Sequence, residues 1–244
     1  MKKLLLTFTL FMLLIIPAYA ETLRVIPYPA SADTQSEGAS SAPANINHKQ
    51  SEYFDTQTDY FTAKSTDTRI ILSNFPTYQQ TKENTCGPAA ALTVLYYYGV
   101  TNYTEEDLAR EMKTKPYPIG TNPKDMLAFF ERLKWKTESN ITHSRFEEYD
   151  DFMNFVKKNL AENTPIMVEN VEWGGHWRVI IGYDTMGTES TLDDVLIMVD
   201  PYDTCDHLQD GYAVNNGEKF YSMWFDHSML PEGQRDQPFI IARP

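Results

Sequence analysis

Two residues of the chain have the types and surroundings that nucleophilic catalysis needs. Cys86 stands directly before Gly87-Pro88, at the start of an apolar stretch that predicts a helix over 88–98. The positive end of a helix stabilises a thiolate, the reactive form of cysteine, and Gly87 has no side chain to keep a substrate away. His176 lies in the segment Trp-Gly-Gly-His-Trp, directly before an apolar run. Its ring is a base that could take the thiol proton, so the pair predicts a thiol that attacks carbonyl groups.

Two further polar residues fit roles around this pair. Asp200 ends an apolar run, and a carboxylate there would hold the ring of His176 in one tautomer. Gln80 lies six residues before Cys86, and its amide, together with the backbone N–H of Cys86, would form an oxyanion hole. Gln79 is the neighbour that competes for this role. Each assignment has a structural alternative: an inert buried cysteine, a histidine that merely opens a strand, and an ordinary Asp-Pro turn.

A second group of residues could bind a metal ion instead. It combines a thiol, an imidazole and carboxylates within a short stretch: Cys205, Asp206, His207, Asp203 and Asp210. The group has too few ligands for a closed zinc site. Cys205 could also form a disulfide with Cys86, which would switch the nucleophile off. We therefore predict no metal and no cofactor, and keep the disulfide as an alternative.

The elements that must position these residues change in character along the chain. Helical periodicity comes first and strand-like runs come second. The predicted elements are a strand at 70–72, helices at 88–98, from 104, at 123–133 and at 146–160, and strands at 165–169, 177–183, 195–200 and 239–242. This order predicts an α+β architecture with a mostly antiparallel sheet, in which the sheet carries His176 and Asp200 and a helix carries Cys86.

Composition excludes several classes of protein. The 244 residues are 42% hydrophobic and 13% aromatic, which is typical of a globular protein. Two cysteines are too few for a disulfide scaffold, a four-cysteine zinc module or a cysteine-ligated iron–sulfur cluster. The net charge of −13 argues against nucleic acid binding and against docking on an anionic membrane surface.

The first twenty residues have the features of a secretory signal peptide. Two lysines precede an apolar run from Leu4 to Ile16, and Ala18-Tyr19-Ala20 offers an A-x-A cleavage site. The apolar run is short for a membrane span, so we favour cleavage over an uncleaved anchor. We expect an exported protein, periplasmic or extracellular, with no membrane insertion after signal removal.

The remaining chain divides into two parts. Residues 21–68 are rich in Ser, Ala, Pro and Gln, and we expect a poorly ordered lead-in or linker, either a tether or a pro-segment. Residues 69–244 are predicted to form one domain. The sequence does not predict the oligomeric state.

Taken together, the motifs resemble those of family 39 of the cysteine peptidases. These are papain-fold enzymes typified by the bacteriocin-processing, double-glycine peptidases, and the stand-alone exported members are the most similar. The motifs are Gln80-x5-Cys86-Gly87-Pro88-Ala89-Ala90, Gly175-His176-Trp177-x4-Gly182-Tyr183-Asp184 and Val199-Asp200-Pro201. The gap of 24 residues between His176 and Asp200 is longer than expected, with the excess in an acidic segment at 185–194.

The resemblance implies a fold, a set of roles and an activity. It implies a papain-like division into an N-terminal helical half and a C-terminal antiparallel sheet half, with a cleft between them. It also implies Cys86 as nucleophile, His176 as general base and acid, Asp200 as orienting residue and Gln80 as oxyanion donor. We therefore expect a secreted thiol peptidase that acts on a peptide or protein substrate. The family tends to cut after Gly-Gly.

Two alternatives keep the same fold. A papain-like thiol can pass its acyl group to an amine instead of water, which would make the protein an acyl or isopeptide transferase. The fold could also serve as a non-catalytic peptide-binding module. The complete set of four residues argues against the binding module, because binding needs no aligned nucleophile.

Overall fold

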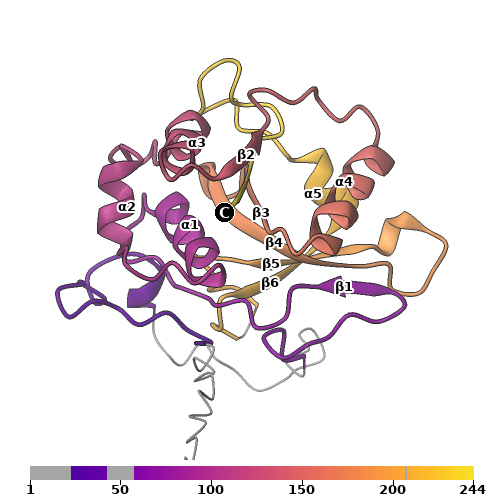
Figure 1. Cartoon of the computed structure of the whole chain (residues 1–244), viewed down its shortest axis with the longest axis horizontal. Helices are drawn as coiled ribbons and strands as arrows, with labels where there is room; N and C mark the ends of the chain where they lie inside the picture. Colours follow the sequence, from indigo (N-terminus) through magenta and orange to yellow (C-terminus); the bar gives the residue numbers. More distant parts are fainter. Residues whose placement is uncertain (1–22, 43–57, 207) are drawn as a thin grey trace, which may run out of the picture.

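An antiparallel sheet forms the centre of the molecule in the computed structural model, which describes residues 23–42, 58–206 and 208–244 (Figure 1). The predicted signal peptide, 1–20, lies outside the described residues. The strands are β1 (Arg69–Ile71), β2 (Lys136–Ser139), β3 (Ile166–Asn170), β4 (His176–Asp184), β5 (Val195–Val199), β6 (Tyr212–Asn216) and β7 (Phe239–Arg243). Their order is β2-β7-β3-β4-β5-β6, with β1 paired to β4, and each pairing is antiparallel.

The helices lie in two groups. In Figure 1, α1, α2 and α3 lie together on one side, and α4 and α5 lie together on the other. The helices are α1 (Cys86–Tyr97), α2 (Glu105–Glu111), α3 (Pro123–Arg132), α4 (Tyr149–Ala161) and α5 (Gly217–Ser222), with short 3-10 turns η1 (Ala39–Ser41), η3 (Glu172–Gly174) and η4 (Thr191–Asp193). The fold is therefore α+β, as the sequence predicts. The papain-like division is also confirmed, with Cys86 in the helical half and His176 in the sheet half.

Helix α1 is buried because its sequence is apolar on every side. All its residues from Cys86 to Leu95 are buried, and it packs against α2 and β4. Such a helix has no solvent face, so its position is fixed by the core around it. Helix α2 starts with a capping box between Thr104 and Asp107, which satisfies backbone N–H groups at its first turn. Because α1 is buried and packs against β4, its first residue, Cys86, has a fixed position beside the sheet.

The hairpin of β4 and β5 brings His176 and Asp200 together. His176 is the first residue of β4, and Asp200 follows the last residue of β5. Because the two strands are antiparallel, with Val179 opposite Val199, the start of one lies beside the end of the other. The long segment 185–194 connects the opposite ends of the strands, away from both residues. The 24-residue gap therefore leaves the pairing of His176 with Asp200 intact.

The lead-in packs against the domain where it is described, which differs from the poor order that its composition predicts. The guanidinium group of Arg24 donates two hydrogen bonds to the carboxylate of Asp59, at 2.7 and 2.8 Å. Ile26 is buried, and its backbone N–H donates to the carbonyl of Thr77 at 2.9 Å, while the N–H of Thr77 donates to the carbonyl of Arg24 at 2.9 Å. The composition argument misses this packing because it counts apolar side chains, whereas backbone hydrogen bonds and one ion pair hold the segment.

A second part of the lead-in contacts the loop that carries Gln80. The backbone N–H of Ser40 donates to the carbonyl of Gln80 at 3.1 Å, and that of Gly38 donates to Glu83 Oε1 at 3.1 Å. Gly38 has a φ of 70°, and a Cβ there would lie 2.6 Å from the Gln80 carbonyl oxygen, so this approach requires glycine. Part of the predicted linker therefore covers the candidate site loop. The domain boundaries at 20 and 68 stay a prediction.

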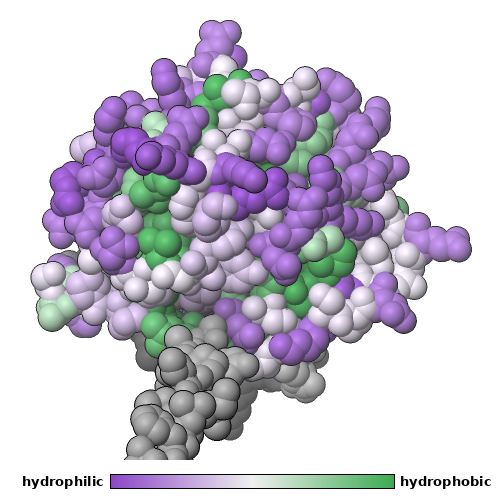
Figure 2. All heavy atoms as spheres, in the orientation of Figure 1, coloured by the Kyte–Doolittle hydropathy of each residue, from purple (hydrophilic) through white to green (hydrophobic). Residues whose placement is uncertain are grey.

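Most of one face of the molecule is hydrophilic. Figure 2 shows hydrophilic side chains over most of the face seen in Figure 1, with hydrophobic ones in a few separate areas. None of the helices in the described ranges is long and apolar enough to cross a membrane.

Candidate active site

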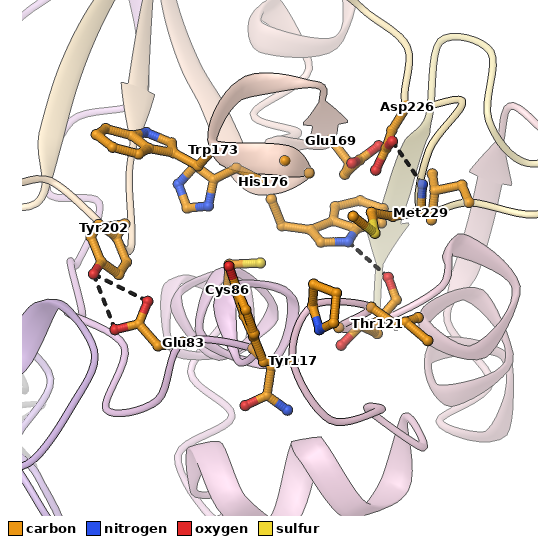
Figure 3. A pocket seen from close by; sticks show the side chains of 18 of the residues that line it. Glu83, Cys86, Tyr117, Thr121, Glu169, Trp173, His176, Tyr202, Asp226 and Met229 are labelled. Carbon is orange, nitrogen blue, oxygen red and sulfur yellow. Dashed lines mark hydrogen bonds between the residues drawn. The ribbon is translucent and has the colours of Figure 1, made fainter.

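A pocket of about 230 Å³ lies between the start of α1 and the start of β4. Its lining includes Gln80, Cys86 and His176, three of the four predicted site residues. Figure 3 shows the ring of His176 above Cys86, with Trp173 and Tyr202 to one side and a carboxyl-rich wall to the other. The fourth predicted residue, Asp200, is hydrogen bonded to the ring of His176. The structure thus brings all four residues to one place.

Cys86 is the first residue of α1 and a free thiol, with 7% of its surface exposed. At this position its backbone N–H has no acceptor within the helix, and the helix dipole favours negative charge on the sulfur. Gly87 has a different role from the one its lack of a side chain suggests. A Cβ at Gly87 would lie 2.8 Å from the Cβ of Thr121, so the glycine makes room for Thr121 rather than for a substrate.

His176 is held in one orientation by Asp200. Its Nε2 lies 2.6 Å from Asp200 Oδ1, and both side chains are buried. The same oxygen accepts the backbone N–H of Tyr202 at 2.8 Å, and the Tyr202 ring packs edge-on against the imidazole at 6.4 Å between centroids. Because Nε2 is occupied by Asp200, Nδ1 is the nitrogen left to interact with the thiol of Cys86, which lines the same pocket.

The surroundings favour the protonated form of His176. Burial on its own would lower the pKa of the ring, but the charge and hydrogen bond of Asp200, followed by those of Cys86, outweigh it and raise the pKa of His176 to about 9. An imidazolium with this pKa stays protonated at neutral pH. A protonated ring beside the thiol of Cys86 places a positive charge next to the sulfur.

Asp200 is kept ionised by the positive groups around it. Burial would raise the pKa of Asp200, but the charge and hydrogen bond of His176, the charge of Arg178 and the N–H of Tyr202 lower it below its ordinary value. Arg178 lies 3.9 Å from Asp200 Oδ2 and is itself held by Asn170 at 2.9 Å. A carboxylate that stays charged can orient and stabilise the imidazolium without taking its proton.

Gln80, and not Gln79, reaches the pocket. Its Nε2 donates one hydrogen to the carbonyl of Lys82 at 2.7 Å, which fixes the amide and leaves its second N–H for another acceptor. The side chain of Gln79 lies elsewhere: its Oε1 accepts from Gln209 Nε2 at 3.5 Å, and its backbone carbonyl accepts the hydroxyl of Tyr28 at 3.0 Å. Together with the backbone N–H of Cys86, the Gln80 amide can provide the two donors that an oxyanion hole needs.

The loop between Gln80 and Cys86 is anchored by a buried carboxylate that the sequence did not single out. Glu105, the first residue of α2, accepts the hydroxyl of Tyr78 at 3.0 Å and the backbone N–H of Thr81 at 2.9 Å. It also accepts the hydroxyls of Thr81 and Thr85 at 2.6 and 2.5 Å. Nothing in the spacing of the sequence shows that this loop folds over α2.

Exposed aromatic and aliphatic side chains form the rim of the pocket. Tyr117 is 70% exposed, Trp173 65% and Ile119 42%. Trp173 is held in the left-handed region at φ 57°, and its ring lies 6.0 Å from that of Tyr202. Large side chains exposed around a pocket are typical of a binding surface.

The second candidate cluster has a structural role in the residues described. Asp203 Oδ2 accepts the backbone N–H groups of Asp210 and Gly211 at 3.0 and 2.9 Å, and so shapes the turn before β6. Within the described ranges, no group of three or more His, Cys, Asp or Glu side chains is placed to hold a metal ion. Cys205 and Cys86 are both free thiols, and His207 lies outside the described residues.

Comparisons with known proteins connect this geometry to a family. The family model described as Peptidase_C39 like family matches residues 72–226. The peptidase domain of Streptococcus ComA, a bi-functional ABC transporter involved in a quorum sensing pathway, is 20% identical, with a TM-score of 0.47 over 70% of this chain and 98% of that chain. A double glycine motif protease from an AMS/PCAT transporter, solved in complex with the leader peptide, is 16% identical, with a TM-score of 0.43 over 69% of this chain and 91% of that chain. The curated proteins give no match.

The matched segment contains all four predicted site residues. It begins just after β1 and runs through Gln80, Cys86, His176 and Asp200 to Asp226 in the pocket wall. The match covers well over half of the chain, and the chain therefore belongs to the Peptidase_C39 like family.

Proposed function

We propose that this protein is a thiol peptidase that hydrolyses peptide bonds through Cys86, His176 and Asp200, with Gln80 as oxyanion donor. The observation that carries the proposal is that Cys86 and His176 line one pocket that opens to solvent, with the ring of His176 held by Asp200 at 2.6 Å. A binding module would have no need of an imidazole held between a thiol and a carboxylate.

The first half of the reaction forms an acyl-enzyme. The thiolate of Cys86 attacks the carbonyl carbon of the substrate, a C–S bond forms, and the carbonyl oxygen becomes an oxyanion. The Gln80 amide and the Cys86 backbone N–H stabilise that charge. His176, already protonated, gives its proton to the leaving nitrogen as the C–N bond breaks, and the amine product departs.

The second half restores the enzyme. The ring of His176, now neutral, takes a proton from a water molecule that attacks the thioester carbon. A second oxyanion forms at the same donors, the C–S bond breaks, and the carboxylic acid product leaves. The thiolate of Cys86 and the imidazolium of His176 are regenerated, while Asp200 stays ionised throughout.

We further propose that the protein acts outside the cytoplasm, since its first twenty residues have a signal-peptide pattern with a cleavage site. The exposed aromatic rim formed by Tyr117 and Trp173 supports a peptide or protein substrate, whose extended chain can lie across the rim. Fractionation of cells that express the full chain, with detection of the mature N-terminus, tests the location.

The test of the activity is incubation of the mature protein with a peptide library, with and without reductant, alongside Cys86→Ala. We expect cleavage by the native protein only, dependent on a reduced thiol. Product masses separate the alternatives, because hydrolysis adds water to the acyl fragment and transfer adds an amine. Cleavage that persists in Cys86→Ala would contradict the proposal.

A further inference from the structure

Two buried carboxyl groups face each other in the wall of the pocket that holds Cys86. Glu169, on β3, is 2% exposed, and Asp226 is fully buried. Both line the pocket, and Figure 3 shows their carboxyl groups turned toward one another on the side away from Tyr202. The two groups are close enough for the charge of Asp226 to act on Glu169. Neither residue has a role in the chemistry of the Cys86 thiol described above.

One oxygen of each carboxyl group lacks a partner among the remaining described residues. Glu169 Oε2 and Asp226 Oδ2 receive no N–H or hydroxyl from them. The other oxygen of Asp226 is fully used, since it accepts the backbone N–H groups of Ser228 and Met229, both at 3.0 Å. Asp226 is therefore fixed by its own loop, and its free oxygen is directed at Glu169.

The pair lies directly against the backbone of the catalytic strand. Gly175, which precedes His176, has a φ of 114°, and a Cβ there would lie 2.5 Å from Asp226 Oδ2 and 3.2 Å from Glu169 Oε1. Any side chain at this position would fill the space beside the free oxygen of Asp226 and the carboxyl group of Glu169. The glycine thus keeps the acidic pair open at the point where the pocket meets the catalytic histidine.

Two carboxyl groups so close and so buried cannot both be ionised without a cation. Burial, then the charge and hydrogen bond of Asp226, then the charge of Cys86, raise the pKa of Glu169 well above its ordinary value, and Arg178 opposes this only in part. Arg178 is itself engaged with Asn170, at 2.9 Å, and with Glu172. A cation placed beside these two buried carboxyl groups would therefore be strongly attracted.

We infer that Glu169 and Asp226 form a subsite that binds the basic side chain of a Lys or Arg residue close to the scissile bond of the substrate. An ammonium or guanidinium group can donate to both free oxygens at once. Met229 and Leu230, which line the same pocket, provide an apolar wall for the aliphatic stem. The positive charge of the ligand then lies between the two carboxyl groups and offsets their repulsion. This inference rests on the proposed peptidase function.

The test compares matched peptides that differ only in Lys or norleucine at one position. A library cleaved by the native protein first identifies the position at which basic residues are enriched. We expect kcat/KM for the Lys peptide to exceed that for the norleucine peptide by about tenfold or more, as for a buried charge contact. The double variant Glu169→Gln/Asp226→Asn should bring the ratio close to one, with the norleucine peptide still cleaved. The double variant is needed because a single one leaves one charge in place.

Controls separate this subsite from other acidic groups. Glu83→Gln removes a different carboxylate that lines the pocket, and Glu162→Gln removes an exposed one that pairs with Arg243 at 2.9 Å. We expect both to keep the preference for Lys. Native cleavage with no preference for a basic residue would overturn the subsite and leave the peptidase standing. Loss of the preference in Glu83→Gln, with the double variant unaffected, would also overturn it.

If no library peptide is cleaved, that result would count against the peptidase itself. A second measurement then still tests the acidic subsite. Modification of Cys86 by 2-aminoethyl methanethiosulfonate, a cation, is compared with modification by the neutral methyl methanethiosulfonate. We expect the rate ratio to favour the cation in the native protein and to fall severalfold in the double variant, once melting curves show that it is folded. Equal ratios in the two proteins would overturn the acidic subsite.

Discussion

The backbone N–H of Gln80 donates to the carbonyl of Pro201 at 2.9 Å, so the oxyanion loop is bonded directly to the residue after Asp200. Gln80 belongs to the helical half and Pro201 follows the last residues of β5 in the sheet half. The two sides of the candidate site are therefore joined by the main chain as well as by side chains. A substitution that moves one of these two loops should therefore also move the other.

Replacing the orienting carboxylate should change both the rate and its pH dependence. Asp200→Asn removes the charge that helps to raise the pKa of His176 to about 9. We expect kcat/KM to fall by about 10²- to 10⁴-fold, because the ring loses its preferred tautomer. The alkaline limb of the pH–rate profile, which for the native protein should lie near pH 9, should move to lower pH. Asp184→Asn, at the other end of β4, is the matched control; an unmoved limb in Asp200→Asn would contradict the account.

The two neighbouring glutamines should behave differently. Gln80→Ala removes a donor from the oxyanion hole, and we expect kcat to fall by about 10²- to 10³-fold. Alkylation of Cys86 by iodoacetamide forms no oxyanion at a carbonyl carbon, so its rate should stay near that of the native protein. Gln79→Ala, whose side chain does not line the pocket, should leave kcat unchanged. Equal losses in the two variants would show that Gln80 acts through the fold alone.

The sequence predicted the elements with strong apolar patterns and missed those at the borders of the sheet. Strands β3, β4, β5 and β7 and helices α1 to α4 appear close to their predicted ranges. Strands β2 and β6 are the two ends of the sheet and read Lys-Thr-Glu-Ser and Tyr-Ala-Val-Asn-Asn. An end strand is half exposed and is held by backbone hydrogen bonds, so it needs no apolar run.

The residues of the candidate site also differ in whether the sequence marks them. Cys86, His176 and Asp200 sit next to glycines, prolines or strand ends, and Gln80 is marked by its place six residues before Cys86. The fold brings the four together; their roles stay a prediction. Glu169 is one of five buried residues of β3, and nothing in the run Ile-Met-Val-Glu-Asn marks it. Its partner Asp226 is 57 residues away in the numbering. Such a pair exists only through tertiary contact, which local patterns do not record.

Glu105 should stabilise the protein by anchoring the loop before Cys86. Glu105→Ala leaves the hydroxyls of Tyr78, Thr81 and Thr85 without their buried acceptor. We expect the free energy of unfolding, from urea titration, to fall by about 2 kcal/mol or more. Glu106→Ala, on an exposed neighbour, should change it by less than about 0.5 kcal/mol. Equal losses in the two variants would contradict an anchoring role.

The acidic pair should lower stability as pH rises. The pKa of Glu169 is raised in the folded protein, so the folded state holds a proton that the unfolded state loses above about 4.5, the ordinary value. Stability then falls with rising pH above that point, by at most about 1.4 kcal/mol per pH unit for one proton. Glu169→Gln removes this effect, and we expect its free energy of unfolding relative to native to increase between pH 5 and pH 8. A relative stability independent of pH would argue that Glu169 is ionised in the fold.

The ion pair of Cys86 and His176 is the central claim, and the alkylation rate of Cys86 at pH 6 tests it most directly. A Cys205→Ser background removes the other thiol, which is exposed. With iodoacetamide, we expect Cys86 to react faster than free cysteine at the same pH by about tenfold or more, because it is a thiolate where free cysteine is almost wholly protonated. His176→Ala should lose this advantage. Equal rates with and without His176 would contradict the account.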